Sequence, residues 1–332
     1  MISTFSIISV LLGFLITLFT LPYWIKRARE HHLVGLDVHK LDGREVAELG
    51  GLVVVFSIII AILSNIAFKV FIYEVKANII FLLAAGLSIL IAMVIGLVDD
   101  ILGWKIGLRQ YQKVILSFLI PLPVMVINAG VSKISIPFFG IVDLGLIYPL
   151  LIIPLIIVFC SNSFNMIAGF NGLETGMGIL TISTLGYLSW YADQTNAGFI
   201  AVCTLSALIA FFLFNKFPSK VFPGDTFTYS IGTIIAIIAI YGNIEKFALI
   251  ILLLYYFEFL LKLRGKFQKE SFGKVLPDGS LKNRYNKWYG LTHVSISLQK
   301  RLFGKASEEG TVILILLAQS LICISTVIYF FT

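Results

Sequence analysis

The sequence predicts an all-α polytopic membrane protein with about ten transmembrane helices. Hydrophobic residues make up 58% of the 332 residues and charged residues 13%, whereas a soluble domain carries about 45–50% apolar and roughly 25% charged residues. The apolar residues form continuous runs of about 20 residues, which is the length a helix needs to cross a bilayer. Because these runs do not alternate between apolar and polar positions, an outer-membrane β-barrel is excluded.

The apolar runs place the spans in chain order. The first run has no basic start and no small-residue cleavage site, and it ends in Lys26 and Arg27, so it reads as a retained span. Between the fourth and fifth spans, residues 132–146 alternate around Gly140, which predicts a short extracytoplasmic β-hairpin. Residues 262–309 form a large loop, and we expect a single integral membrane transferase domain over residues 1–332. The predicted spans are 3–25, 50–68, 78–98, 112–129, 147–164, 176–191, 197–215, 226–242, 246–262 and 310–330.

The charged residues gather on one side of these spans. Of the 25 Lys and Arg residues, 21 fall on the side that carries the loop 262–309. The positive-inside rule makes this side cytoplasmic and puts both termini outside, so the net charge of +7 reports topology, and no nucleic acid partner is expected. Of the 18 acidic residues, 14 lie on the same side. Topology alone needs only Lys and Arg, so the cytoplasmic face is predicted to be the working surface.

Carboxylates lie at the ends of two predicted spans. Asp99 and Asp100 end the third span, where they repel each other and oppose the helix dipole unless a cation relieves them. Asp225 begins the eighth span, next to Thr226. A solvated helix end and a helix cap are the structural alternatives. The functional interpretation is a divalent-metal site or a carboxylate base.

Polar and basic residues accompany these carboxylates at the same predicted depth. Asn162 and Asn165 share one helix face, and Asn171 precedes a glycine in a turn. Their amides could hold a hard cation, a nucleobase edge or a phosphate, or could join helices. Residues of the segment 104–113 and of the loop 35–51 complete the face with basic, acidic and aromatic side chains. This second group comprises Trp104, Lys105, Arg109, Lys113, Asp37, His39, Lys40 and Glu48.

Together these residues are of the types that enzymes use for phosphoryl transfer. Carboxylates that bind a divalent cation, with lysines beside them, position and neutralise phosphate oxygens. The sequence has neither a P-loop nor a kinase motif, so ATP hydrolysis is not expected. Because the site lies at the membrane edge, a lipid phosphate is the expected acceptor. A secondary transporter is the alternative from another class, since many spans with carboxylates at the membrane edge also fit transport.

Three motifs carry a resemblance to a known family. GlyLeuValAspAsp (96–100), AsnSerPheAsnMetIleAlaGlyPheAsnGlyLeuGlu (162–174) and PheProGlyAspThrPhe (222–227), in this order, resemble the polyprenyl-phosphate N-acetylhexosamine-1-phosphate transferases. The second and third motifs are most similar to the eukaryotic and archaeal branch, UDP-N-acetylglucosamine–dolichyl-phosphate N-acetylglucosaminephosphotransferase. The last cytoplasmic loop has only His293 where bacterial branches carry a histidine-rich motif.

The resemblance implies a role for each matching residue. Asn165 and Asp225 would hold Mg²⁺, with Mn²⁺ as a substitute. The catalytic group would comprise Asp99 and Asp100 beside the reacting phosphates, Lys113 on the pyrophosphate and Asn162 next to the phosphates. Gly169, Asn171, Phe222 (by stacking) and the Glu48 loop would frame the uridine, and the lipid phosphate would approach near Lys40. One departure is the stretch 266–273, LysPheGlnLysGluSerPheGly, where eukaryotic enzymes carry a sugar-recognising ProArgHisArg. Arg264, Lys266 and Lys269 are the expected substitutes there.

The function that the resemblance implies is transfer of N-acetylglucosamine 1-phosphate from UDP-N-acetylglucosamine to a polyprenyl phosphate, expected to be dolichyl phosphate. UMP would leave, and the lipid-pyrophosphate sugar would start N-glycan assembly. A bacterial-type transferase that uses undecaprenyl phosphate is the closest alternative. The resemblance also implies a homodimer and an active site on the cytoplasmic face. The membrane would be the plasma membrane of an archaeon or the endoplasmic reticulum of a eukaryote.

Overall fold

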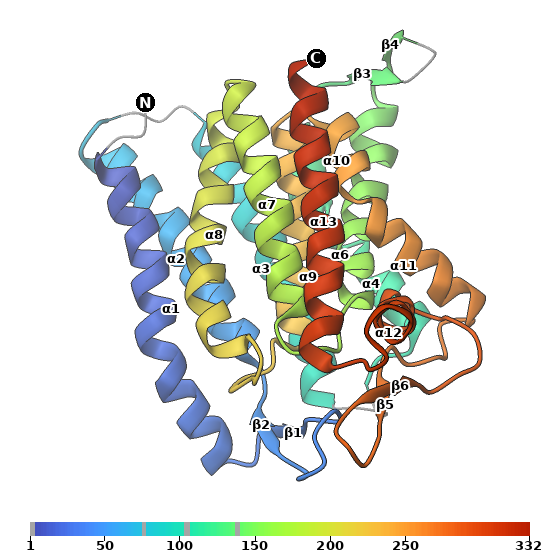
Figure 1. The fold of residues 1–332 in the computed structure, drawn as a ribbon. Coiled ribbons are helices and arrows are strands. Elements are labelled where there is room, and N and C mark those ends of the chain that lie inside the picture. The colour runs from blue at the N-terminus through green and yellow to red at the C-terminus, as the bar shows by residue number, and fades with distance from the viewer. Residues whose placement is uncertain (1–3, 75–77, 103–106, 137–139) are drawn as a thin grey trace.

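A computed structural model describes residues 4–74, 78–102, 107–136 and 140–332. The described chain is a bundle of roughly parallel and antiparallel helices with short strand pairs at its two ends (Figure 1). Seven helices within these ranges are long and apolar enough to cross a membrane, so the chain is an all-α membrane protein, as predicted. They are α1 (Thr4–Glu30), α2 (Gly50–Phe71), α3 (Ile79–Leu102), α6 (Ile153–Met166) with the π-helical turn η1 (Tyr148–Ile152) before it, α8 (Thr195–Asn215), α9 (Gly224–Tyr241) and α13 (Glu308–Phe331).

The other three predicted spans have a different local structure, so seven helices of this kind stand where the sequence predicts ten spans. The predicted span 112–129 is divided into α4 (Gln110–Ser117) and α5 (Leu122–Val126), with Pro121 between them. The predicted span 246–262 is divided at Leu252, whose ψ of 11° leaves the helical range. It gives α10 (Glu245–Ile251) and α11 (Leu253–Arg264). The span predicted at 176–191 begins earlier, as α7 (Leu173–Tyr191), and includes Glu174.

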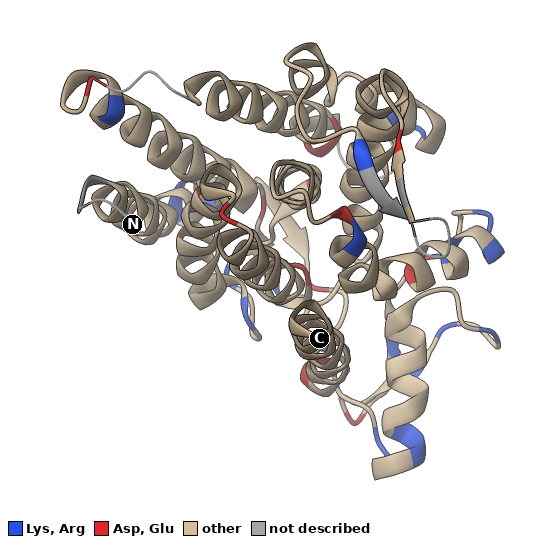
Figure 2. Cartoon of the chain, turned by 90° about the horizontal axis from the view of Figure 1, so that it is seen from above, with Lys and Arg blue, Asp and Glu red and all other residues tan. Residues whose placement is uncertain are grey.

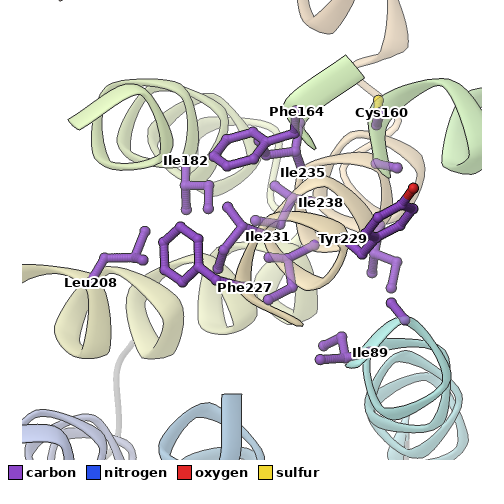
Figure 3. Packing of buried hydrophobic residues seen from close by; sticks show 14 of the residues in the cluster. Ile89, Cys160, Phe164, Ile182, Leu208, Phe227, Tyr229, Ile231, Ile235 and Ile238 are labelled. Carbon is purple, nitrogen blue, oxygen red and sulfur yellow. The ribbon is translucent and has the colours of Figure 1, made fainter. Parts of the chain in front are cut away.

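Helix α9 is the centre of the bundle. From Thr226 to Tyr241 every residue of this helix is buried, because α3, α6, α7, α2 and α8 pack around it. Figure 3 shows Phe227, Ile231 and Ile235 of α9 among side chains of the surrounding helices. Residues that begin α9 are thereby held in a fixed position by the most buried element of the molecule.

Glycine allows α3 to approach α9 at the point where the helix begins. A Cβ atom on Gly96 would lie 2.5 Å from backbone atoms of Asp225 and Thr226, closer than real side chains come. The same helix α3 ends with Asp99 and Asp100. This close approach therefore brings the carboxylates of one helix end to the first turn of another.

The two ends of the bundle carry different structures (Figure 1). Both chain termini lie at one end with β3 (Lys133–Ile136) and β4 (Gly140–Asp143), which pair antiparallel within the segment predicted as a hairpin. Residues 137–139, which join these strands, lie outside the described residues. The opposite end carries two more antiparallel pairs, β1 (Val34–Leu36) with β2 (Glu45–Ala47) and β5 (Gly273–Val275) with β6 (Leu281–Asn283).

Charged residues are few among the helices of the bundle, as the colouring of the chain in Figure 2 shows. Near the end that carries β1 and β5, helix α12 (Leu291–Phe303) packs beside α13. Its first turn is held by Glu258 of α11, whose Oε2 accepts a hydrogen bond of 2.6 Å from the Leu291 amide. The loop 262–309 is therefore folded against the bundle by specific hydrogen bonds.

Candidate active site

The predicted cluster at the helix ends is present. Lys113 of α4 places its Nζ 2.5 Å from Asp99 Oδ2 and 2.9 Å from Asp225 Oδ2. Asn165, in the last turn of α6, donates from Nδ2 to Asp225 Oδ1 at 2.7 Å and to Thr228 Oγ1 at 2.9 Å. Four helices thus bring two carboxylates, one ammonium group and one amide together. The arrangement can hold a cation and can bind phosphate oxygens.

Asp100 has different hydrogen-bond partners from the adjacent Asp99. Its Oδ1 accepts from the Asp225 amide at 2.7 Å, and its Oδ2 accepts from the amide and hydroxyl of Thr226 at 2.8 and 2.7 Å. These are free amides of the first turn of α9, where a carboxylate also complements the helix dipole. Asp100 therefore caps α9 from another helix, which leaves Asp99 as the member of the pair that faces Lys113.

A cavity of about 580 Å³ opens beside this cluster. It is lined by β1 and the residues that follow it, by Glu48 after β2, by the loop after α6, by Asn215, by the start of α9 and by Phe272. Backbone hydrogen bonds hold these segments together: Phe222 N donates to Ala47 O at 2.7 Å, and Gly51 N donates to Pro223 O at 2.9 Å. The lining residues include Asp37, His39, Glu48, Gly169, Phe170, Asn171, Phe222, Asp225, Thr228 and Phe272.

Glu48 gives the cavity wall a group whose ionisation is sensitive to its surroundings. Partial desolvation in the cavity, together with repulsion from Asp100, raises the pKa of the Glu48 carboxyl above its ordinary range. Gly35 on the paired strand leaves the room that this carboxyl occupies, since a side chain at Gly35 would collide with it. Glu48 is thus placed where an incoming anion or donor group would change its protonation.

A second buried cluster joins four segments at the same end of the molecule. Lys40 forms ion pairs with Glu308, the first residue of α13, and with Asp37 at 3.7 Å. Asn171 donates from Nδ2 to Asp37 Oδ2 at 3.0 Å and from its amide to Glu308 Oε1 at 3.2 Å. His39 lies 3.7 Å from Glu308 and accepts from the Gly273 amide at 3.1 Å. Ligand atoms of Asp37, His39 and Glu308 lie within 4.8 Å of one another, and the Lys40 ammonium lies beside both carboxylates.

Two predicted residues face away from the cavity. Lys40, expected near a lipid phosphate, is held by Glu308 and Asp37 and lines a neighbouring cavity of about 410 Å³. Asn162, expected beside the phosphates, donates to Ser117 Oγ at 3.0 Å and accepts from the Tyr229 hydroxyl at 3.4 Å. It therefore joins α6 to α4 and α9 and positions the helix that carries Lys113. Trp104 and Lys105 lie outside the described residues.

The basic residues expected to contact the sugar do not line the cavity. The Arg264 guanidinium lies over the Tyr289 ring at 6.0 Å, and Lys269 Nζ lies over the Tyr285 ring at 5.2 Å. Phe272 lines the cavity instead, 5.7 Å from the His39 ring. Its carbonyl faces the ring of His293, whose pKa is lowered chiefly by burial.

The residues that the sequence did not single out for the site are Glu308, Phe272 and Thr228. Glu308 stands 268 positions from its partner Lys40, so no local pattern could connect them. The only signal is an acidic first turn after Ser307, whose side chain caps α13, and this signal is ordinary for a helix start. Thr228 lies one helical turn after Asp225, and its place on the same face could have been predicted.

Comparison with known proteins identifies the family. The family model described as glycosyl transferase family 4 matches residues 81–243. A protein of Saccharolobus solfataricus is 35% identical over 93% of this chain and 92% of its own length. It is provisionally named UDP-N-acetylglucosamine–dolichyl-phosphate N-acetylglucosaminephosphotransferase.

The chain belongs to glycosyl transferase family 4. A Sulfolobus acidocaldarius protein with the same provisional name is 31% identical over 97% of this chain and 95% of its own length. A more distant member of the comparison is the phospho-N-acetylmuramoyl-pentapeptide-transferase of Streptococcus pyogenes serotype M6, 26% identical over 85% of this chain and 91% of its own length. Within the chain described here, the region 81–243 that matches the family model includes Asp99, Lys113, Asn165 and Asp225. The family predicted from the three motifs is thereby confirmed.

Proposed function

We propose that the chain transfers N-acetylglucosamine 1-phosphate from UDP-N-acetylglucosamine to dolichyl phosphate or a related polyprenyl phosphate. The observation that carries the proposal is the position of Lys113 between Asp99 and Asp225 at the edge of the 580 Å³ cavity. An ammonium group held by two carboxylates can exchange one of them for a phosphate at little cost. The names of the two archaeal relatives supply the donor and acceptor classes.

In the proposed reaction, an oxygen of the lipid phosphate attacks the β-phosphorus of the donor. A new phosphorus–oxygen bond forms, the bond to the bridging oxygen breaks, and UMP leaves with that oxygen. The Lys113 ammonium stabilises negative charge that develops on the phosphate oxygens. Asp99 Oδ2 orients Lys113, and Asp99 Oδ1 accepts from the Leu108 amide at 2.7 Å. Once Lys113 turns to a phosphate oxygen, Asp99 Oδ2 becomes available to accept a proton from the lipid phosphate, whereas Asp100 stays engaged by the amides of α9. The product would start N-glycan assembly.

The donor set at the cluster fits Mg²⁺. Mg²⁺ prefers oxygen ligands, chiefly one or two carboxylates with substrate phosphates, and carboxylate oxygens of Asp99 and Asp225 lie around one ammonium group. Asp225 and Asn165 would hold the ion, with Mn²⁺ as a substitute, and Asn165 would present its amide oxygen after rotation of the amide. When bound, the ion supplies positive charge for the pyrophosphate oxygens.

An apolar cavity supports a long-chain acceptor. It has a volume of about 360 Å³ and is lined by Phe159, Leu252, Tyr256 and other side chains of η1, α6, α9, α10 and α11. Helix α6, which contributes Phe159 to this cavity, ends near Asn165. A polyprenyl tail along α6 would therefore place its phosphate at the same end of the molecule as Asp225.

The proposed topology has the strands β1 and β5 in the cytoplasm. The helices α7, α4 with α5, and α10 with α11 would each complete a crossing, which gives ten spans. The end with β1 and β5 would then hold 21 of the 25 Lys and Arg residues, as the positive-inside rule requires. We propose the plasma membrane of an archaeon, because the two most similar relatives named above are archaeal, and a homodimer as the assembly.

The transporter alternative receives less support from the contacts. Glu258 is the acidic residue nearest the middle of a predicted span, and it is engaged by the Leu291 amide and lies 3.8 Å from Lys262. Its Oε2 therefore holds the first turn of α12, and the Lys262 ammonium offsets the charge on the side of Oε1, so the carboxylate is not presented alone to a transport path.

UMP release by the purified protein tests the proposal. The assay contains UDP-N-acetylglucosamine, dolichyl phosphate and Mg²⁺ in detergent, with undecaprenyl phosphate as the competing acceptor. Release that requires the lipid and stops with EDTA or in Asp225→Asn supports the transferase. Binding of the UDP-sugar without release would show that the acceptor is wrong. Absence of both from folded protein would overturn the transferase and favour flux measurements in liposomes.

A further inference from the structure

Polar side chains meet in a second cavity at the end of the bundle that carries the chain termini, away from the proposed active site. This cavity has a volume of about 250 Å³ and lies where the start of α3, the turn between α7 and α8 and the end of α9 come together. Cavities for drug-sized ligands measure about 300–1,000 Å³, so this one suits a smaller molecule. The polar residues that define this carboxamide pocket are Asn78, Asp193, Gln194, Asn196 and Asn243.

The hydrogen-bonding groups of these five side chains are not used by the protein itself. Within the described part of the chain, none of the five side chains has a hydrogen-bond or ion-pair partner. Each carboxamide offers N–H donors and a carbonyl acceptor, whereas a carboxylate offers acceptors. Unused donors and acceptors from three separate segments therefore converge on one cavity, where a ligand can meet both kinds of group.

Two aromatic rings add an apolar wall to the carboxamide pocket. Phe81 and Tyr241 both line it, and their ring centroids lie 5.6 Å apart with the planes at 88°. Tyr241 is buried, and its hydroxyl donates to the Phe81 carbonyl oxygen at 2.9 Å, so this hydroxyl is not left for a ligand. What the two residues offer is ring carbon, whose electron-rich faces attract C–H groups.

The charge of the carboxamide pocket limits the class of ligand. Asp193 is the one charged residue among the described residues that line it. Its negative charge disfavours phosphates and other anions. A single carboxylate also makes a weak site for a divalent cation, because protein sites for Ca²⁺ gain affinity from the number of charged ligands. Uncharged polar molecules are the class that remains.

We propose that the carboxamide pocket binds a neutral hexose. A sugar hydroxyl is both a donor and an acceptor, so it can pair with the carboxamides and with Asp193. The apolar C–H face of the sugar ring would lie against Phe81 and Tyr241. The 18 residues of α9 separate Asp225 from Asn243 by about 27 Å, so the hexose would bind independently of the nucleotide donor.

Saturation-transfer NMR on the purified full-length protein, in a detergent without a sugar headgroup, tests this inference. The probes are glucose, galactose and mannose, each compared with its own uronate, which has the same ring and a carboxylate. At least one hexose should bind, and its uronate should bind at least about tenfold more weakly because of Asp193. Saturating UDP should leave the hexose signal unchanged.

Two variants remove groups from the carboxamide pocket. Asp193→Asn should weaken hexose binding by about tenfold and reduce the preference for the hexose over its uronate to less than about threefold. The backbone at Asp193 is left-handed, with φ at 57°, and asparagine tolerates this conformation. Asn243→Gly removes one carboxamide and should weaken hexose binding by about three- to tenfold.

Asn128→Gly is the matched control for Asn243→Gly. Both asparagines are exposed and left-handed, with φ at 49° for Asn128 and 48° for Asn243, but Asn128 does not line the pocket. Glycine keeps this backbone conformation in both variants. The affinity of Asn128→Gly for the hexose should therefore equal that of the wild type.

Several results would overturn the proposal. One is hexose binding that is unchanged in Asp193→Asn or in Asn243→Gly, or that falls equally in Asn128→Gly. Another is a hexose signal that UDP abolishes, which would place the sugar in the cavity beside Asp225. Folded wild type that binds none of the three hexoses, or binds Ca²⁺ alone, would also contradict a sugar site. None of these results alters the expected release of UMP, so each proposal can fail without the other.

Discussion

At the residue scale, adjacent side chains with the same chemistry have different roles. Asp99 faces Lys113, whereas both oxygens of Asp100 accept hydrogen bonds from the first turn of α9. The helix α3 brings both carboxylates to this point, but only the backbone of α9 decides which of them becomes a cap. A pair of acidic residues in a sequence therefore does not by itself give two catalytic groups.

This division predicts opposite phenotypes for two neighbouring substitutions. Asp100→Asn removes the charge and one acceptor from the cap of α9, so the free energy of unfolding should fall by about 1–3 kcal/mol. Asp99→Asn should lower the free energy of unfolding less than Asp100→Asn, because Lys113 keeps Asp225 as a partner, and should lower kcat for UMP release by on the order of a hundredfold, through loss of the Asp99 charge beside Lys113. Melting curves and turnover on the same preparations measure both effects. Equal loss of stability in the two variants would contradict the assignment.

Glu48 predicts a pH-dependent stability. A raised pKa means that the folded protein holds the Glu48 proton more tightly than the unfolded chain does. Stability is therefore lost as the pH rises from the ordinary carboxyl range through the raised pKa, and Glu48→Gln avoids this loss. The variant should melt about one or two degrees above the wild type near neutral pH and equally at about pH 4. The matched control is Glu45→Gln, since Glu45 does not line the cavity. A difference that is constant with pH would contradict the role of Glu48.

At the element scale, the site depends on how closely α3 and α9 approach. Gly96 leaves no room for a Cβ atom against the backbone of Asp225 and Thr226, at 2.5 Å. The contact holds the cap of α9 and the carboxylate of Asp225 in one fixed relation to Asp99. At Gly96, helix α3 therefore contacts the backbone of α9 directly, and this contact positions the site.

Gly96→Ala should separate the two helices. Forcing a methyl group into this contact should lower the free energy of unfolding by about 1–3 kcal/mol and should weaken UMP release, because Asp225 moves relative to Lys113. Gly86→Ala is the matched control on the same helix α3, since a Cβ atom there would lie 3.8 Å from its nearest neighbour. Thermal melting of the two variants side by side makes the measurement. Equal stability of Gly96→Ala and Gly86→Ala would show that the contact is not tight in solution.

At the scale of the whole molecule, the sequence predicts the long helices and the end at which the site forms. Continuous apolar runs determine seven spans, and the motifs at 99–100, 162–171 and 222–227 do meet. The break between α4 and α5 was predictable from Pro121 and Pro123. The break at Leu252 was not, because no proline or glycine marks it. Nor was the pairing of Lys40 with Glu308, which depends on how the first cytoplasmic loop and the last helix meet in space.

Accessibility of introduced cysteines tests the membrane arrangement of the whole molecule. The native cysteines Cys160, Cys203 and Cys323 are buried, so they should give little background with a maleimide that cannot cross membranes. Exposed positions at the end that carries the termini are Asp193, Asn128 and Asn243. Asp193 follows α7, Asn128 follows α5, and Asn243 precedes α10, so each adjoins one of the three helical segments that complete the proposed crossings. Lys266 is exposed at the opposite end.

Cysteine variants at Asp193, Asn128 and Asn243 should react in intact cells, whereas Lys266→Cys should react only after lysis. The reason is that the end with 21 of the 25 Lys and Arg residues is expected to stay in the cytoplasm. Failure of one outer variant to react until lysis would contradict the proposed crossing that adjoins it, which is α7 for Asp193, α4 with α5 for Asn128 and α10 with α11 for Asn243. Reaction of Lys266→Cys in intact cells would invert the topology. The site would then face away from nucleotide sugars made in the cytoplasm, so the same result would also contradict the proposed donor.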